Sequence, residues 1–243
     1  MLKRLVLGTR LEPPARVVRT ALRGAGPRRN AKDDDNLRLL MLLSLARDAN
    51  CIDVGANVGK ILSSILAAAP DGRHIAFEPV RHLRESLMRR FPMVDVRGEA
   101  VADYTGMAEF DVVPDLPSRS GLSTTLALDQ HWRTEKVSVP VISLDEAVDD
   151  QSPPALIKID VEGGELGVVR GAERILRQFR PTLAFEHQKG SSGTVNRKAT
   201  DELYAALHGH GYRVFDMDGA EQTAGRFMDC YLRGTRWNFL AHS

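Results

Sequence analysis

Short apolar runs alternate with amphipathic stretches from residue 36 to residue 243. The apolar runs predict strands at 51–55, 74–79, 93–101, 155–160, 181–188, 212–218 and 236–243. Stretches with helical spacing lie at 36–45, 60–70, 80–91, 165–179 and 201–211. Because strands and helices alternate along the chain, we expect βαβ units and a mostly parallel sheet with helices on both faces.

One segment breaks this rhythm after the third predicted strand. Residues 106–114 and 135–144 alternate apolar and polar side chains like antiparallel strands, and they flank the polar loop 115–132. We expect a small antiparallel insertion here that overhangs the sheet. A short helix or turn at 144–148 leads into the fourth main strand, and a Gly/Ser-rich loop covers 189–199.

Charge is distributed unevenly between the first 30 residues and the rest of the chain. Residues 1–30 hold eight Lys or Arg against one acid, whereas the other 213 residues hold 25 basic and 31 acidic side chains. A basic arm is typical of proteins that bind nucleic acid or anionic lipid, and of transit peptides. We favour an extension that packs its apolar side chains on the domain, because no aromatic residues are interleaved with the basic ones.

Helix signals place the end of this arm near residue 35. Pro13, Pro14 and the segment 24–30 (GAGPRRN) should interrupt any long helix in the arm. The acids at 33–35 would then cap a helix with an apolar stripe of Leu37, Leu40, Met41, Leu43 and Leu45. We therefore predict a basic arm over residues 1–35 and one α/β domain over residues 36–243.

Composition limits the class of protein. Hydrophobic residues make up 43% of the chain and charged residues 27%, which is ordinary for a globular protein. The two cysteines, Cys51 and Cys230, cannot form a disulfide framework, and neither lies in a zinc-binding spacing. No apolar run approaches the ~20 residues that cross a bilayer, and residues 1–25 lack the apolar core of a secretory signal. We expect a soluble, cytoplasmic protein.

Glycines follow the first predicted strand in the stretch IDVGANVGK, residues 52–60. Gly55 and Gly59 at a strand-to-helix turn let a ligand approach the backbone, where the N–H groups of the helix can meet anionic atoms. The spacing is not that of a P-loop, because no Gly lies five residues before Gly59 and Ile61 follows Lys60. It also lacks the G-x-G-x-x-G pattern of dinucleotide-binding folds. A glycine pair alone is also compatible with a tight packing turn.

An acid at the end of the second predicted strand strengthens the case for a ligand. Glu78 lies 23 residues after Gly55, one βαβ unit further along the chain. A carboxylate in this place can accept hydrogen bonds from the two hydroxyls of a ribose. The spacing favours a nucleoside site over a solvated strand end.

Three further carboxylates follow the fourth predicted strand in the stretch LIKIDVEGGE, residues 156–165. Asp160 ends the strand, and Glu162 lies beside it. Glu165 follows two glycines at the start of a helix, where an acid favours the helix dipole and needs no chemical role. The cluster could serve a metal, a catalytic base or a cofactor.

Together these motifs resemble the FkbM family of S-adenosylmethionine-dependent methyltransferases. The resemblance covers about residues 50–190 and rests on IDVGANVG (52–59), FEP (77–79), GEAVADYTG (98–106), VPVISLDE (139–146), IKIDVEGGE (157–165) and PTLAFEH (181–187). It implies a class I, Rossmann-like fold with a seven-stranded, mostly parallel sheet and an antiparallel final strand. It also implies S-adenosyl-L-methionine as the cofactor.

The resemblance assigns residues to the cofactor. It implies that the methionine and ribose parts are lined by Asp53, Gly55, Asn57 and Gly59. It also implies that Glu78 binds the ribose hydroxyls. Glu99 and Ala100 would lie against the adenine. By its position at the end of the fourth strand, opposite the glycine loop, we expect Asp160 to face the transferring methyl group. The chain departs from many relatives at Lys60, where they carry an aromatic or hydroxyl residue, and at Glu99, where they carry Asn.

An alcohol acceptor loses its proton as it attacks the methyl group, so a base within ~3 Å helps. Substrates dock at the carboxyl ends of central strands in open α/β sheets. We therefore predict Asp160, Glu162 and His187 as catalytic residues, since His187 is the only histidine at such a strand end. We predict no metal, because no third oxygen ligand joins Asp160 and Glu162.

The expected function is O-methylation of a hydroxyl on a natural product, polyketide or glycosyl group in secondary metabolism. The expected partners are this small acceptor, with no nucleic acid and no membrane span, and both a monomer and a homodimer stay open. Two alternatives also stay open: a nucleotide-dependent oxidoreductase, and a non-catalytic module that binds S-adenosylmethionine. A nucleic-acid methyltransferase lacks support, because no Asn-Pro-Pro-aromatic motif follows the fourth strand.

Overall fold

A twisted, mostly parallel sheet forms the centre of the computed structural model, which describes residues 25–122, 133–189 and 195–243. The sheet has the order β11-β10-β12-β9-β8-β1-β2-β3 within these residues. Its strands are β1 (Asn50–Val54), β2 (Ile75–Phe77), β3 (Asp95–Arg97), β8 (Pro154–Ile159), β9 (Thr182–Glu186), β10 (Arg213–Asp216), β11 (Glu221–Gln222) and β12 (Asn238–His242). Strand β12 is antiparallel to both of its neighbours, β9 and β10. This topology is the predicted Rossmann-like methyltransferase fold, with β11 as one short additional strand.

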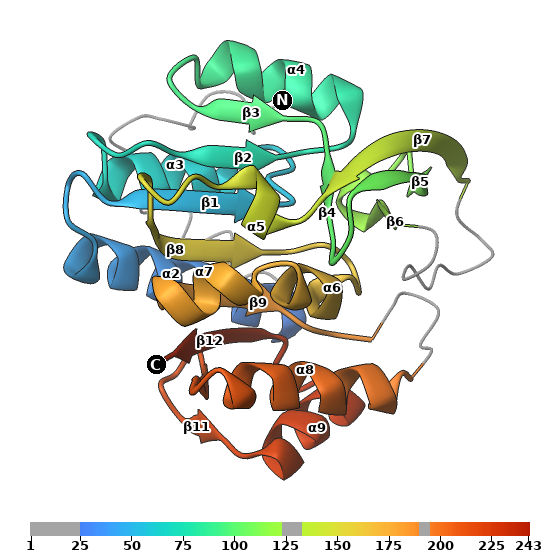
Figure 1. The fold of residues 1–243 in the computed structure, drawn as a ribbon. Coiled ribbons are helices and arrows are strands. Elements are labelled where there is room, and N and C mark those ends of the chain that lie inside the picture. Colours follow the sequence, from blue (N-terminus) through green and yellow to red (C-terminus); the bar gives the residue numbers. More distant parts are fainter. Residues whose placement is uncertain (1–24, 123–132, 190–194) are drawn as a thin grey trace.

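Helices cover both faces of this sheet (Figure 1). The helices α5 (Leu144–Ala147), α6 (Glu165–Arg170), α7 (Glu173–Gln178), α8 (Arg197–Gly209) and α9 (Ala224–Arg233) contribute to one face. The helices α2 (Ala25–Ser44), α3 (Lys60–Ala68) and α4 (Arg81–Arg90) cover the other. Strand alternation explains the two layers, because Ile52 and Val54 point to the α6 side and Cys51 points to the α2 side.

The predicted insertion forms a second, smaller sheet with the order β4-β7-β5-β6. It consists of β4 (Ala100–Val101), β5 (Gly106–Val112), β6 (Gly121–Leu122) and β7 (Glu135–Ile142), with a 3₁₀ helix at Pro117–Arg119. The pairs β5–β7 and β5–β6 are antiparallel, as expected, and β4–β7 is parallel. The expected third strand at 93–101 is therefore two strands, since β3 belongs to the main sheet and β4 to the insertion.

Helix α2 begins at least eleven residues earlier than the sequence indicated. Pro27 lies in its first turn, where proline leaves no hydrogen bond unmade, so it does not interrupt the helix. The acids at 33–35 lie inside the helix and do not cap it; Asp33 is buried. Leu37 and Met41 face the core, but Leu43 is 78% exposed. Helix α2 thus runs through the boundary that we placed between residues 35 and 36, and the arm at residues 1–24 lies outside the described residues.

Two other predictions about helices need correction. The helix expected at 165–179 is two helices, α6 and α7, which separate at Gly171. A Cβ at Gly171 would lie 2.1 Å from the carbonyl oxygen of Ala102, so the chain packs there against the insertion. Helix α9 was not predicted at all. In the part of the chain that the structure describes, no helix is long and apolar enough to cross a membrane.

Candidate functional site

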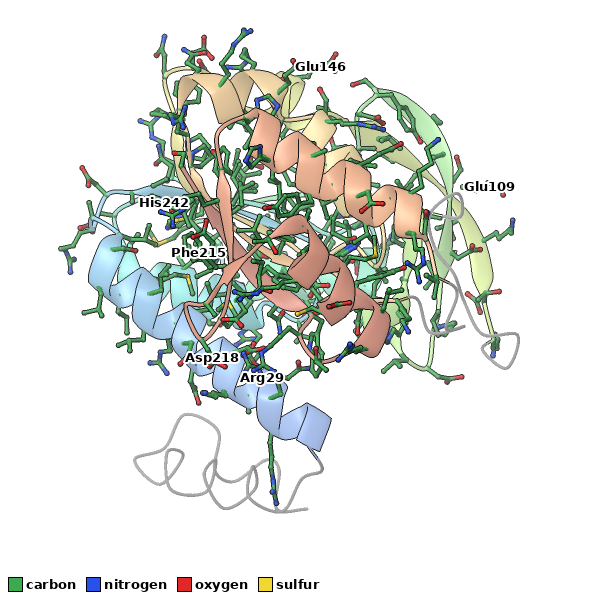
Figure 2. The ribbon with its side chains drawn as sticks, turned by 90° about the horizontal axis from the view of Figure 1, so that it is seen from below. Arg29, Glu109, Glu146, Phe215, Asp218 and His242 are labelled. Carbon is green, nitrogen blue, oxygen red and sulfur yellow. The ribbon has the colours of Figure 1, made fainter. Side chains whose placement is uncertain are left out.

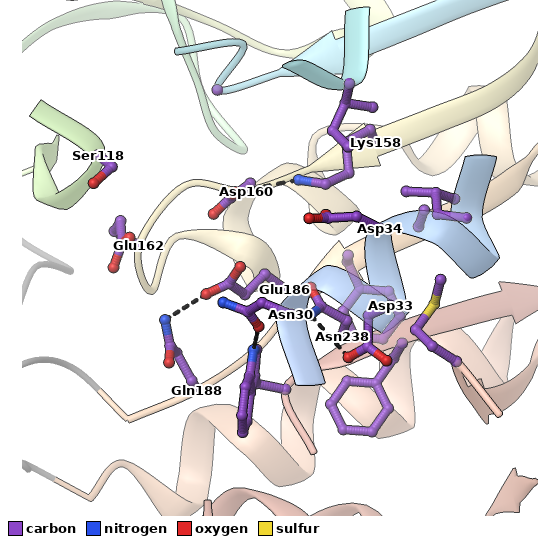
Figure 3. A pocket seen from close by; sticks show the side chains of 18 of the residues that line it. Asn30, Asp33, Asp34, Ser118, Lys158, Asp160, Glu162, Glu186, Gln188 and Asn238 are labelled. Atoms are coloured by element: carbon purple, nitrogen blue, oxygen red, sulfur yellow. Dashed lines mark hydrogen bonds and ion pairs between the residues drawn. The ribbon is translucent and has the colours of Figure 1, made fainter. Parts of the chain in front are cut away.

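Two neighbouring cavities lie at the carboxyl edge of the main sheet. The larger has a volume of about 890 Å³ and lies among α2, the ends of β8 and β9, the start of β12 and the end of α9. The smaller is a narrow cleft at the end of β2, next to the insertion. The two share five lining residues, Gly55, Asn57, Ser118, Asp160 and Glu162. Figure 3 shows the larger cavity, with Asp160 and Glu162 on one side and Asp33 and Asp34 on another.

The glycine turn between β1 and α3 is packed against the end of β8. Gly55 has φ +80°, and a Cβ on it would lie only 1.9 Å from the carbonyl oxygen of Asp160. The N–H of Asp160 in turn donates to the carbonyl oxygen of Val54 at 3.0 Å. Asn57 also has a positive φ, 50°, so this turn keeps a left-handed geometry next to the cavities. Gly55 is therefore required by close packing as well as by its backbone conformation.

Glu78, for which the sequence predicts a contact with the ribose, lines the narrow cleft. Its carboxylate accepts hydrogen bonds from the backbone N–H groups of Asn57 at 2.7 Å and Val80 at 2.9 Å. Burial raises the pKa of Glu78 to about 7, although these two hydrogen bonds lower it. The cleft is otherwise mostly apolar, and it includes Phe77, Val80, Ala100, Val101, Phe110 and Leu122. Glu99 and Ala100 line it too.

A buried row of charges runs under α2 from β1 to β8. Asp53 and Lys158 are register partners on adjacent strands, and their side chains lie on the same face of the sheet. Neither carboxylate oxygen of Asp53 has a good hydrogen-bond partner in the described ranges. Burial raises the pKa of Asp53 to about 6, Lys158 lowers it, and Asp160 raises it. Asp53 is thus a buried carboxylate at the cavity wall that needs a donor.

Lys158 joins the two acids of this row. Its Nζ lies 3.4 Å from Oδ2 of Asp160, drawn as a dashed line in Figure 3. Burial alone would lower the pKa of Lys158, but Asp160, Asp53 and Glu186 together raise it. The lysine therefore stays charged and offsets part of the negative charge at the cavity wall.

Glu162 lies where the two cavities meet. Its carboxylate forms an ion pair with Arg119 at 3.1 Å, which joins the loop after β8 to the insertion. Burial raises the pKa of Glu162 to about 7; Asp160 raises it as well, and Arg119 lowers it. The narrow cleft has a volume of about 60 Å³.

His187 does not face either cavity, contrary to the prediction of a histidine base. It is buried; its Nδ1 lies 3.2 Å from Oε2 of Glu165, and its Nε2 lies 3.0 Å from the hydroxyl of Thr200. The rings of Phe227 and Tyr231 stack on its two sides. Both ring nitrogens therefore face Glu165 and Thr200 and not the cavities.

Glu186, one residue earlier, points into the larger cavity instead. Burial raises its pKa well above the ordinary value, Asp160 adds to this effect, and Lys158 opposes it. The sequence placed Glu186 at a strand end beside His187, but strand ends alone do not reveal which of two neighbours turns inward.

Helix α2 supplies a wall that sequence reasoning missed. Asn30, Asp33 and Asp34 line the larger cavity. Asn30 accepts a hydrogen bond from the indole N–H of Trp237, and Asp33 accepts one from the side chain of Asn238 at 3.2 Å. Lys60 forms an ion pair with Asp34, so the departure from the family pattern at Lys60 connects α3 to this wall. The sequence predicts a helix cap for the acids at 33–35, and this prediction gave no indication that Asp33 and Asp34 line a cavity.

Comparison with known proteins identifies the family. The profile of the Methyltransferase FkbM domain matches residues 53–214, which include both glycines of the turn, Glu78 and the acids after β8. This chain belongs to the FkbM methyltransferase family. S-Adenosylmethionine is therefore the cofactor, and an oxidoreductase is no longer an alternative.

Two similar proteins are longer than this FkbM methyltransferase, and the chain matches only part of each. The AMB antimetabolite synthetase AmbE of Pseudomonas aeruginosa is 27% identical over 208 aligned positions, which cover 70% of this chain and 10% of the synthetase. The crystal structure of the FkbM methyltransferase from Methylobacillus flagellatus KT is 21% identical with a TM-score of 0.51, over 83% of this chain and 45% of that one. The chain thus spans a tenth of one relative and under half of the other, and the solved structure confirms the fold.

The residues at the cavities of this FkbM methyltransferase fit the cofactor. A mostly apolar cleft with one buried acid, Glu78, suits a nucleoside. The buried carboxylate of Asp53, whose oxygens have no close hydrogen-bond donor within the described residues, suits a positively charged donor. Outside the undescribed segments, no group of three His, Cys, Asp or Glu side chains is arranged to hold a metal ion.

Proposed function

We propose that this domain transfers the methyl group of S-adenosylmethionine to a hydroxyl of a small molecule or glycosyl group. The observation that carries the proposal is the acid at the junction of the two cavities, Glu162, whose pKa is raised to about 7. A base is most effective when its pKa lies near the working pH. A hydroxyl needs such a base as it attacks, whereas a nucleophile without a proton to lose does not.

We further propose how the cavities divide the two substrates. The narrow cleft, with Glu78 facing the ribose and Glu99 and Ala100 beside the adenine, takes the nucleoside. The turn from Asp53 to Gly59 takes the amino-acid part of the cofactor. The rest of the larger cavity, bounded by α2 and the start of β12, then remains for the acceptor, because 890 Å³ is in the upper range for a small-molecule site.

When bound, the cofactor supplies a methyl group on a positively charged sulfur, which needs no further activation. Asp160 and Asp53 place negative charge at the cavity where the positive charge would lie. Glu162 accepts the proton of the acceptor hydroxyl, and Arg119 stabilises its carboxylate before the transfer. The remaining contribution of the protein is to align the acceptor with the methyl group in an enclosed site. We propose that no nucleic acid takes part.

The proposal is tested by incubating the protein with labelled S-adenosylmethionine and a panel of hydroxylated glycosides and polyketides. We expect label in a product whose NMR spectrum has an O-methyl signal. For that product, Glu162→Gln should lower kcat by about 100-fold or more, since general bases contribute roughly 10²–10⁴. The binding of S-adenosylhomocysteine should change by less than about threefold, since a neutral amide retains the shape.

Glu109→Gln is the matched control, because Glu109 is an exposed acid on β5 that pairs with Lys136 and lines neither cavity. It should keep the wild-type kcat. Methyl label on nitrogen or carbon would refute the O-methylation proposal. Cofactor binding without transfer to any acceptor class would favour a non-catalytic module.

A further inference from the structure

The loop that joins β8 to α6 has a backbone that needs support from outside. Glu162 has φ +51° and Gly163 has φ +103°, so two successive residues take left-handed conformations. Such a conformation is unfavourable for a residue with a side chain and persists only where the surroundings fix it. The same loop lines the narrow cleft through Val161, Glu162 and Gly164. Whatever fixes this loop therefore also fixes one wall of the cofactor site.

Glu165 supplies the first contact that fixes the loop. It is 3% exposed, and its Oε1 accepts the backbone N–H of Gly163 at 2.9 Å. Its other oxygen, Oε2, lies 3.2 Å from Nδ1 of His187. Because an ionised carboxylate can only accept, Nδ1 of His187 carries the hydrogen in this contact. The loop is thus connected through one carboxylate to β9.

His187 is itself held on every side. Its Nε2 lies 3.0 Å from the hydroxyl of Thr200 on α8, and its backbone N–H donates to the carbonyl oxygen of Trp237 at 2.7 Å. On α9, Phe227 and Tyr231 stack on the ring at centroid distances of 5.4 and 4.9 Å. Since all these groups are on elements packed against the sheet, His187 cannot move without disturbing two helices.

We infer that Glu165 and His187 are positioning residues, which hold the loop 160–164 in the shape that forms the cofactor wall and presents Glu162. This inference rests on the proposed cofactor cleft. His187 is then not a catalytic base. It acts on the loop 160–164 through the carboxylate of Glu165. The competing explanation is a buried pair that contributes to stability alone.

The experiment compares two substitutions of His187. Asn can place an amide N–H where Nδ1–H of the histidine lies, whereas Leu cannot donate. We expect His187→Leu to weaken the binding of S-adenosylhomocysteine by about tenfold, because one buried carboxylate oxygen loses its donor. His187→Asn should restore binding to within about threefold of the wild type. The measurements are calorimetric Kd values and hydrogen exchange of the amides at 160–164.

Glu165→Gln is a second variant for the case that His187→Leu does not fold. It keeps an acceptor for Gly163 and weakens the contact with His187, so it should weaken binding in the same direction. His74→Leu is the matched control: His74 is also buried, with Nε2 2.7 Å from the carbonyl oxygen of Ala69, at the amino end of β2. It should lower Tm and leave the Kd unchanged.

Equal binding by His187→Leu and the wild type, or equal losses in His187→Leu and His187→Asn, would overturn the inference in favour of a stabilising pair. If the wild type and a Glu78→Ala variant bind S-adenosylhomocysteine equally well, the assignment of the cleft to the cofactor is overturned instead. The two failures are therefore distinguishable without knowing the acceptor.

Discussion

At the scale of single residues, three acids at the cavities contribute to how the stability of the domain depends on pH. The pKa values of Asp53, Glu78 and Glu162 are raised to about 6, 7 and 7, and burial is the first cause in each. Between the ordinary and the raised pKa, the folded state holds a proton that the unfolded state has released. Raising the pH through this window therefore favours unfolding.

We expect the Tm of the cofactor-free protein to fall as the pH rises from about 5 to about 8. Glu78→Gln cannot ionise, so its Tm should fall less over the same range, whereas the exposed-acid control Glu109→Gln should follow the wild type. Thermal unfolding in a series of buffers at constant ionic strength measures the slopes. A wild-type Tm that rises steadily to pH 8 would contradict the raised pKa values.

Sequence reasoning indicated several of the residues that line the cavities, because they are next to strand ends. Gly55, Glu78 and Asp160 directly follow or end apolar runs, and parallel strands bring such ends together at one edge. The prediction of His187 as a base was wrong, because residues distant in the sequence surround its ring. Phe227 and Tyr231, which hold it, lie on α9, and nothing in the strand pattern of β9 reveals that contact.

At the scale of elements, the turn between β1 and α3 can be tested with two glycines of similar backbone geometry. Gly55 has φ +80° and Gly219 has φ +86°, but a Cβ would meet Asp160 at Gly55 and nothing within 4 Å at Gly219. Gly219→Ala should cost about 1 kcal/mol for the left-handed backbone alone. Gly55→Ala should cost about 3 kcal/mol or more, because the backbone of β8 cannot move aside.

Urea unfolding measures both free energies, and binding of S-adenosylhomocysteine should be lost only in the Gly55 variant. Similar losses of stability in the two variants would mean that the close approach of Gly55 to Asp160 is not a constraint on the fold.

Ion pairs centred on Asp218 attach the first turns of α2 to the turn after β10 and to Arg236. Asp218 forms ion pairs with Arg29 at 2.5 Å, Lys32 at 2.7 Å and Arg236 at 3.4 Å. Figure 2 shows Arg29 beside Asp218 at this end of the helix. The pairs lower the pKa of Asp218 to about 2, with the hydrogen bonds from Arg29 and Lys32 as the first causes. They therefore persist at neutral pH.

Asp218→Asn should lower the free energy of unfolding by about 1 kcal/mol, since partly exposed pairs are individually weak. It should also increase hydrogen exchange in residues 28–37, and the difference from the wild type should shrink in 1 M salt. Glu221→Gln breaks an exposed pair with Arg213 that does not involve α2, so it should leave exchange in α2 unchanged. Unaltered exchange in the Asp218 variant would argue against this attachment.

The elements that sequence reasoning missed have weak or misleading local signals. Pro27 suggested a helix break but lies in a first turn, where it is tolerated. Helix α9 buries only Phe227 and Tyr231, yet Thr223 caps its start and Gly234 its end, and these signals could have located it. The division of 93–101 between two sheets depends on pairing between β4 and β7, which are some 40 residues apart, and no local pattern encodes it.

At the scale of the whole molecule, the acids after β8 are paired with basic side chains at the cavities. Asp160 is paired with Lys158, and Glu162 with Arg119, so each candidate oxygen ligand already has a basic partner. We expect methyl transfer to continue unchanged in excess EDTA. Activity that is lost in EDTA and restored by Mg²⁺ would contradict this expectation and assign the two acids to a metal.

The larger cavity is closed by contact between distant parts of the chain. Asn30 and Trp237 are 207 positions apart, and Asp33 and Asn238 are 205 apart. A ribosome makes the chain from its amino end, so the glycine turn, Glu78 and Asp160 all emerge while this wall is still missing its partner. The α2 wall of the larger cavity is therefore completed only once β12 has been synthesised, long after the glycine turn and the loop after β8.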